Sequence, residues 1–263
     1  SEVYKPGATL DRTLEYGGKT VPIYRDRPLN VFSDVDFIWT GEENENQRRL
    51  EYLGGEFRTR YGIDVSSFQG EIDWDAVADD NIDFAMVRVG FRGTGTGSLN
   101  TDKYYEQNIR GAMRAGLETG VYFFAQAVTV EEAIEEADYV ISLLDGLDIN
   151  GPVAYDWEMH DSTYRVYGTS PEMATACAVA FCERIKDAGY TPMVYGGTYV
   201  TYMKYDQGAL ADYLSWYPEY KSEKSEKLCP TLVYHMDYWQ FSSTRAVAGI
   251  NGRVDMNIQF IRR

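Results

Sequence analysis

The sequence has few of the residues on which thiol and imidazole chemistry depends. Its three cysteines, Cys177, Cys182 and Cys229, are an odd number without Cys-x-x-Cys spacing, so neither a disulfide framework nor a thiolate metal site is expected. The two histidines, His160 and His235, offer little material for a zinc site or a Ser-His-Asp triad. We therefore expect no metal and no cofactor, and we expect Cys177 and Cys182 to pack as small hydrophobic residues in one apolar helix.

Long apolar runs and clusters of basic residues are also absent. No stretch approaches the roughly 20 apolar residues that span a bilayer, and no signal peptide is visible. Because the chain opens at Ser1 and not at Met, we expect either that a leader was removed or that the chain was trimmed. The net charge of −16 without a Lys/Arg-rich run disfavours nucleic acid and anionic lipid as partners. We expect a monomer with a neutral or cationic ligand.

From residue 61 onward, apolar β-branched runs alternate with amphipathic helical segments, which is the pattern of strands joined by crossover helices in a parallel sheet. The pattern predicts five strand-and-helix units and then three strands near residues 213–216, 234–241 and 254–260. That number of strands is enough to close an eight-stranded α/β barrel.

Residues 1–60 differ from the rest, since they are rich in Arg, Glu, Asp, Gly and Asn. They contain one strand candidate at 20–24 and a highly charged run at 42–51. We interpret them as an N-terminal extension of unknown role, and residues 61–263 as the main domain.

The segment 152–158 is the most informative part of the chain, because it predicts a buried strand that carries two carboxyl groups. Successive side chains of a strand alternate between its faces, so Asp156 and Glu158 point one way while Tyr155 and Trp157 point the other, toward helices. Two carboxyl groups that share a site cannot both ionise freely, and one of them becomes a candidate general acid.

Other acids are sorted by their expected position in the barrel, whose chemistry lies at the carboxyl ends of its strands. Asp64 lies toward the end of the first strand and Asp255 lies in the last, so both are candidates for the site. A second group is expected at helix starts or on exposed helix faces, where the helix dipole and solvent stabilise acids; it comprises Asp73, Glu131, Glu132, Glu135 and Glu136.

Several spaced motifs resemble the glycoside hydrolase family 25 lysozymes, the N-acetylmuramidases of the Chalaropsis type. They are Tyr61-Gly62-Ile63-Asp64-Val65-Ser66, Gln69-Gly70, Ile72-Asp73-Trp74, Asp156-x-Glu158, Tyr238-Trp239-Gln240-Phe241-Ser242-Ser243 and Gly252-Arg253-Val254-Asp255-Met256-Asn257. The resemblance covers about residues 61–263 and implies a TIM-like (β/α)5(β)3 barrel. Two strands depart from the family pattern: the third has Tyr122-Phe123-Phe124 without the usual His, and the second has Arg88-Val89-Gly90-Phe91.

The resemblance implies cleavage of the β-1,4 bond between N-acetylmuramic acid and N-acetylglucosamine in bacterial peptidoglycan, and hence a secreted or wall-associated enzyme that needs no metal. Glu158 corresponds to the general acid, Asp156 to its neighbouring carboxyl group, and Asp64 and Asp255 to two further acids. Ionised neighbours would favour the protonated form of Glu158. For Asp156 we favour stabilising positive charge or orienting the substrate 2-acetamido group over acting as the nucleophile.

Aromatic residues are abundant, with 22 Tyr and 5 Trp, and aromatic faces bind the apolar faces of sugars. Because they lie near predicted strand ends, Tyr122, Tyr195, Trp239 and Gln240 are candidates to line the sugar groove. Two alternatives stay open. One is a non-catalytic peptidoglycan-binding barrel, which would have lost a key acid; the other is a different glycosidase such as a chitinase, whose Asp-x-x-Asp-x-Asp-x-Glu strand this chain lacks.

Overall fold

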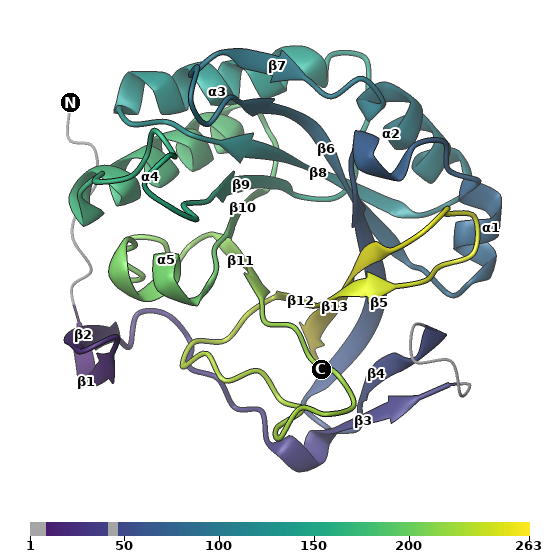
Figure 1. Ribbon diagram of the computed structural model, residues 1–263, viewed down its shortest axis with the longest axis horizontal. Coiled ribbons are helices and arrows are strands. Elements are labelled where there is room, and N and C mark those ends of the chain that lie inside the picture. The colour runs from purple at the N-terminus through teal and green to yellow at the C-terminus, as the bar shows by residue number, and fades with distance from the viewer. Residues whose placement is uncertain (1–8, 42–46) are drawn as a thin grey trace.

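At the centre of the computed structural model, which describes residues 9–41 and 47–263, is a closed barrel of eight strands (Figure 1). The strands are β5 (Phe57–Val65), β6 (Phe84–Arg92), β8 (Glu118–Ala125), β9 (Val153–Trp157), β10 (Pro192–Tyr195), β11 (Leu214–Pro218), β12 (Tyr238–Arg245) and β13 (Val254–Arg262). Strand β5 pairs with both β6 and β13, which closes the barrel. The predicted eight-stranded α/β barrel is confirmed.

Seven of the barrel strands run parallel, whereas β13 is antiparallel to both of its neighbours. The amino end of β13 therefore lies at the same end of the barrel as the carboxyl ends of the other seven strands. Asp255, the second residue of β13, pairs in register with Asp64 near the end of β5. The expectation that every site acid ends its strand is wrong for Asp255, which reaches the site because its strand runs the other way.

Five helices connect the first six barrel strands and lie outside the barrel (Figure 1). They are α1 (Trp74–Asp79), α2 (Tyr105–Arg114), α3 (Val130–Leu143), α4 (Pro171–Asp187) and α5 (Thr198–Met203). The predicted caps form, since Thr129 accepts a hydrogen bond from the Glu132 amide and Pro171 opens α4 after the cap Ser170. Three short elements also occur: strand β7 (Leu99–Thr101), which pairs with β6, and 3-10 turns at Asp34–Asp36 and Ser67–Gln69.

Strand alternation divides the apolar side chains between two cores. One set fills the barrel interior and comprises Phe84, Met86, Ala154, Met193, Tyr195, Trp216 and Tyr238. The other set lies between the strands and the helices, where the Tyr155 ring packs 4.8 Å from that of Phe181 in α4. Cys177 and Cys182 are buried free thiols in α4, as predicted.

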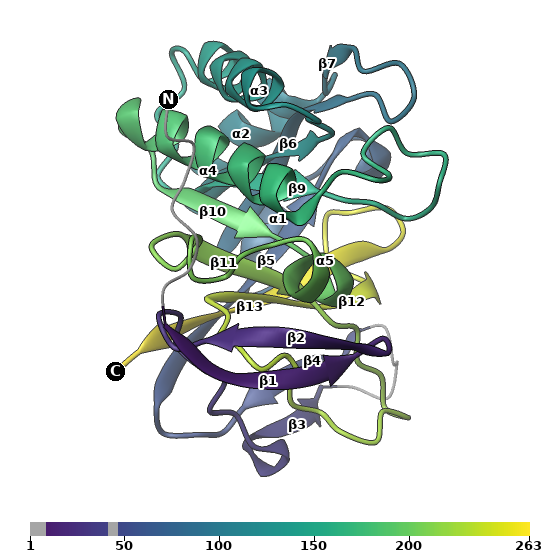
Figure 2. The same cartoon turned by 90° about the vertical axis from the view of Figure 1, so that its left-hand side faces the viewer.

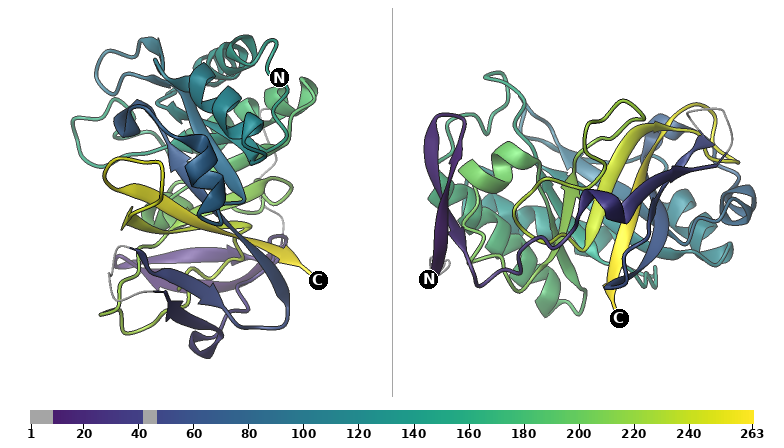
Figure 3. Two further views of the ribbon diagram at one scale, coloured as in Figure 1. Left: turned by 90° about the vertical axis from the view of Figure 1, so that its right-hand side faces the viewer. Right: turned by 90° about the horizontal axis from the view of Figure 1, so that it is seen from below.

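The N-terminal segment forms two antiparallel hairpins outside the barrel: β1–β2 lies beside α5, and β3–β4 lies against β12 (Figures 2 and 3). Their strands are β1 (Leu10–Tyr16), β2 (Lys19–Tyr24), β3 (Phe37–Thr40) and β4 (Arg49–Tyr52). The Phe37 ring of β3 lies 5.4 Å from the Trp239 ring of β12, and Tyr16 of β1 lies 5.1 Å from Tyr202. Part of the predicted charged run, residues 42–46, lies outside the described residues.

The packing of Phe37 on β12 predicts that the hairpins contribute to the stability of the barrel. Phe37 is almost fully buried, so Phe37→Ala leaves a cavity, and we expect it to lower the free energy of unfolding by about 3 kcal/mol. Val35→Ala is the control, since Val35 lies in the same segment with 81% of its surface exposed and should change stability by less than about 0.5 kcal/mol. Urea unfolding measures both; equal stability of the two variants would show that the hairpin is an independent appendage.

Candidate active site

Four carboxyl groups meet in one cleft of about 430 Å³ at the end of the barrel. They come from three strands and one loop: Asp64 from β5, Asp156 from β9, Asp255 from β13, and Glu158 directly after β9. Asp156 and Glu158 share a face because they are two residues apart on an extended backbone. Asp156 is buried, whereas 26% of the Glu158 side chain is exposed at the rim.

Asp64 is held by amide donors from the neighbouring strands. Its Oδ2 accepts hydrogen bonds from Gln240 Nε2 at 2.9 Å and from Asn257 Nδ2 at 2.8 Å. The Gln240 amide is itself oriented by the Tyr195 hydroxyl, which donates to its Oε1 at 2.9 Å, and Asn257 accepts from the Trp216 indole at 2.8 Å. These donors favour the ionised form, although burial still raises the pKa of Asp64 above its ordinary value.

Asp64 and Asp255 form a hydrogen-bonded carboxyl pair. Two carboxyl groups can bond to each other only if one of them keeps a proton. Burial, and then the charge of Asp64, raises the pKa of Asp255 to about 9. The raised pKa of Asp255 therefore favours the proton of this pair on Asp255, while the amide donors around Asp64 favour the negative charge there.

Asp156 and Glu158 form a second hydrogen-bonded carboxyl pair. Burial, followed by the charge of Glu158, raises the pKa of Asp156 well above its ordinary value. The sequence predicts the shared proton on Glu158. In the structure Asp156 is the more deeply buried of the two, and this burial favours its protonated form.

Three of the four predicted groove residues line the cleft, namely Tyr122, Tyr195 and Gln240. The prediction for Trp239 is wrong. Its side chain is fully buried on the outer face of β12 against Phe37, because it alternates with the inward-facing Tyr238 and Gln240. The indole N–H donates to the Glu219 carbonyl at 3.0 Å, so its polar group is also engaged.

Several cleft residues are not among those predicted from the sequence; they include His160, Thr198, Tyr199, Trp216 and Tyr220. His160 could have been found, since it continues the alternation of Asp156 and Glu158. Trp216 lies inside the barrel on β11, whose inward face the sequence pattern does not define. Tyr220 follows β11 in a loop and donates from its hydroxyl to Gln240 Oε1 at 3.1 Å, a contact without a local sequence signal.

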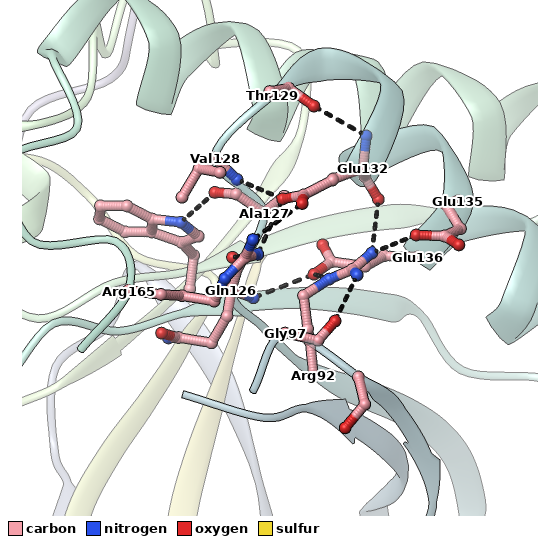
Figure 4. A network of polar contacts seen from close by, with 12 residues as sticks. Arg92, Gly97, Gln126, Ala127, Val128, Thr129, Glu132, Glu135, Glu136 and Arg165 are labelled. Atoms are coloured by element: carbon pink, nitrogen blue, oxygen red, sulfur yellow. Dashed lines mark hydrogen bonds and ion pairs between the residues drawn. The ribbon is translucent and has the colours of Figure 1, made fainter. Parts of the chain in front are cut away.

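A polar network behind the cleft holds the loop that carries Glu158 (Figure 4). The Gln126 side-chain amide donates to the Glu158 carbonyl at 2.7 Å. Arg165, farther along the same loop, donates to the Gln126 carbonyl at 2.7 Å and to both carboxylate oxygens of Glu132 at 2.8 Å. The loop is thus tied at Glu158 to the segment between β8 and α3, and at Arg165 to that segment and to the first turn of α3.

The prediction that the acids of α3 lie at its start or on its exposed face is wrong for Glu136, which belongs to the same network. Glu136 is fully buried and forms an ion pair with the buried Arg92 at 2.8 Å. Burial raises the pKa of Glu136 to about 7, against the opposing effect of Arg92. Glu131 and Glu135 are exposed as predicted, although Glu135 also pairs with Arg92, and Asp73 caps α1.

Within residues 9–41 and 47–263, no group of three or more His, Cys, Asp or Glu side chains is arranged to hold a metal ion. In that same part of the chain, none of the helices has both the length and the apolar character of a membrane span.

A closed α/β barrel with paired carboxyl groups in a cleft at one end defines the class of glycoside hydrolases that work by acid chemistry. Residues 63–250 match the Glycosyl hydrolases family 25. Because this match covers more than half of the chain, the chain belongs to that family.

Known relatives agree with the family assignment. The autolytic lysozyme of Clostridium acetobutylicum is 25% identical over 197 residues, which are 74% of this chain and 54% of the relative. Lysozyme M1 of Streptomyces globisporus is 27% identical over 201 residues, 74% of this chain and 66% of the relative. This chain therefore spans about half to two thirds of the length of these relatives. Among solved structures, a bacterial lysozyme from Streptomyces coelicolor has a TM-score of 0.60 at 25% identity, covering 75% of this chain and 90% of that one.

The raised pKa of Asp255 predicts a specific dependence of stability on pH. An unfolded Asp ionises near pH 4, whereas the folded Asp255 keeps its proton to about pH 9, so its contribution to stability is lost as pH rises through that window. In Asp255→Asn the side-chain amide can still donate a hydrogen bond to Asp64, but it has no carboxyl group that ionises. We expect the variant to gain roughly 3 °C or more in melting temperature over wild type at pH 8 and little at pH 4. A difference that does not grow with pH would contradict the protonated Asp255.

The loop network predicts that Arg165 stabilises the fold. Arg165→Met removes a bidentate ion pair and a hydrogen bond to a backbone carbonyl, and we expect a loss of about 2 kcal/mol in urea unfolding. Arg184→Met is the matched control, because the Arg184–Asp138 pair is half-exposed on the helix surface and should cost less than about 1 kcal/mol. If both variants lost the same free energy of unfolding, the contacts of Arg165 would stabilise the fold no more than an exposed ion pair does.

Proposed function

We propose that this chain is an N-acetylmuramidase that hydrolyses the β-1,4 bond between N-acetylmuramic acid and N-acetylglucosamine in bacterial peptidoglycan. The observation that carries the proposal is the position of the Asp156–Glu158 pair opposite the Asp64–Asp255 pair in one cleft of a family 25 barrel. The names of two relatives, autolytic lysozyme and lysozyme M1, support the same reaction.

Glu158 is proposed as the general acid because 26% of its side chain is exposed at the rim, whereas its neighbour Asp156 is buried. A sugar bound over Glu158 displaces its water and favours its protonated form, so that the proton shared with Asp156 moves to Glu158. Glu158 then gives this proton to the leaving oxygen as the bond to C1 breaks. The water that completes hydrolysis returns a proton to Glu158.

Asp156 becomes a carboxylate when its proton moves to Glu158. In that state it can accept a hydrogen bond from the 2-acetamido N–H and orient the acetamido oxygen toward C1, or stabilise the positive charge at C1 directly. Its depth in the cleft supports either role over that of a nucleophile. The fixed negative charge on Asp64, held by Gln240 and Asn257, adds to the stabilisation of the developing cation.

Aromatic side chains at the rim supply surfaces for the glycan. The exposed rings of Tyr199 and Tyr220 flank the cleft, while Tyr195 and Trp216 line its floor. These flat surfaces suit the apolar faces of pyranose rings. We infer that the protein works as a monomer outside the cell, on the bacterial wall. The two N-terminal hairpins, within residues 9–41 and 47–60, form one folded unit with the barrel in this proposal.

The direct test is to digest purified peptidoglycan and to identify the new reducing end. We expect N-acetylmuramic acid at that end, and Glu158→Gln should lower the rate by at least about 100-fold while the melting temperature stays near that of wild type, because Gln cannot donate the proton. Glu131→Gln is the control, since Glu131 is exposed on α3. New N-acetylglucosamine ends would favour another glycosidase, and binding without cleavage by the wild type would favour a non-catalytic barrel.

A further inference from the structure

His160 contacts the proposed acid on the side away from Asp156. Its Nε2 lies 2.6 Å from Glu158 Oε2, and 62% of its side chain is exposed. Its ring meets the Tyr164 ring edge-on with 5.3 Å between centroids, which limits the positions that the imidazole can take. Asp156, Glu158 and His160 thus form a row of three proton-binding side chains from the buried end of the cleft to solvent.

We propose that His160 is a positioning residue for Glu158 and that its protonation holds Glu158 as a carboxylate and so switches off acid catalysis. This proposal rests on the proposed function. Neutral His160 can donate one hydrogen bond that fixes the Glu158 side chain, or accept one from its protonated form. The imidazolium can only donate, and its charge favours the ionised Glu158, which has no proton to give to the leaving oxygen.

Acids and tyrosines face this pair from the neighbouring strands and loops. The acids are Asp64 of β5, Asp156 of β9, Asp161 of the following loop and Asp255 of β13. The remaining titratable groups are the tyrosines Tyr164, Tyr195 and Tyr220, whose pKa values burial raises above their ordinary value, so they stay neutral wherever imidazole titrates. The cation Arg88 acts on Asp156 and is itself paired with Asp102 at 2.9 Å.

The number of protons in the row then decides activity. One proton, shared between Asp156 and Glu158, gives the active state, because Glu158 can donate while Asp156 is ionised. A second proton goes to His160, and the ion pair with Glu158 then leaves the remaining proton on Asp156. The rate should therefore fall as the pH drops through the range in which His160 takes up this second proton.

Two substitutions of His160 separate positioning from titration. In His160→Gln the amide nitrogen can replace Nε2 as a donor but does not titrate; in His160→Ala both properties are lost. We expect the acid limb of the kcat profile to move down by about one pH unit or more in both variants. At pH 8, we expect His160→Ala to lose about ten-fold in kcat and His160→Gln to lose less. His235→Gln, at the only other histidine, should keep the wild-type profile.

A readout that does not depend on activity is the NMR titration of the two imidazole rings, assigned by comparison with His235→Gln. Replacing Glu158 with Gln removes the carboxylate beside His160, so the titration midpoint of the His160 ring should fall by about one pH unit. An unchanged midpoint in Glu158→Gln, or an acid limb that stays in place in both His160 variants, would overturn the proposal. Absence of glycan cleavage by wild type at pH 8 would instead overturn the proposed function while leaving the NMR result intact.

Discussion

The hydrogen bond between the carboxyl groups of Asp64 and Asp255 is the contact on which the cleft depends. It forms across the seam where the last barrel strand meets the first, and it exists only because β13 runs antiparallel and brings its second residue to the end of β5. Four acids in one cleft would repel one another if all were ionised. Pairing lets two of them keep protons, so the cleft carries about half of its nominal charge before substrate arrives.

The rest of the structure supports this cleft from two sides. On one side, the β3–β4 hairpin packs on the outward-facing Trp239 of β12, while the inward-facing Gln240 is held between Tyr195 and Asp64. On the opposite side, Arg165 and Gln126 tie the loop after β9 to α3. Both supports hold backbone segments and leave the exposed side chain of Glu158 free to meet a ligand.

Local patterns in the sequence predict the fold and much of the site. Strand alternation places Asp156 and Glu158 on one face, and helix caps such as Thr129 and Ser170 mark where helices begin. Features that depend on contacts between elements distant in the sequence are harder to predict from local patterns. The direction of β13, the outward orientation of Trp239 and the burial of Glu136 against Arg92 each follow from contacts across the barrel, for which a periodic pattern carries no signal. The position of the proton shared by Asp156 and Glu158 is equally hard to predict from the sequence, because it depends on how deeply each side chain is buried.

Infrared spectroscopy of the protein at pH 7 reports directly whether Asp156 and Asp255 hold protons, as their raised pKa values predict. Protonated carboxyl groups absorb apart from carboxylates, so wild type should show a protonated-carboxyl band from which Asp156→Asn and Asp255→Asn each remove a separate share. The variant Glu136→Gln measures how much of this band comes from Glu136, a third buried carboxyl group whose pKa is raised to about 7. A band that neither aspartate variant reduces, or no band at all, would show that the four acids of the cleft are ionised and would contradict the account.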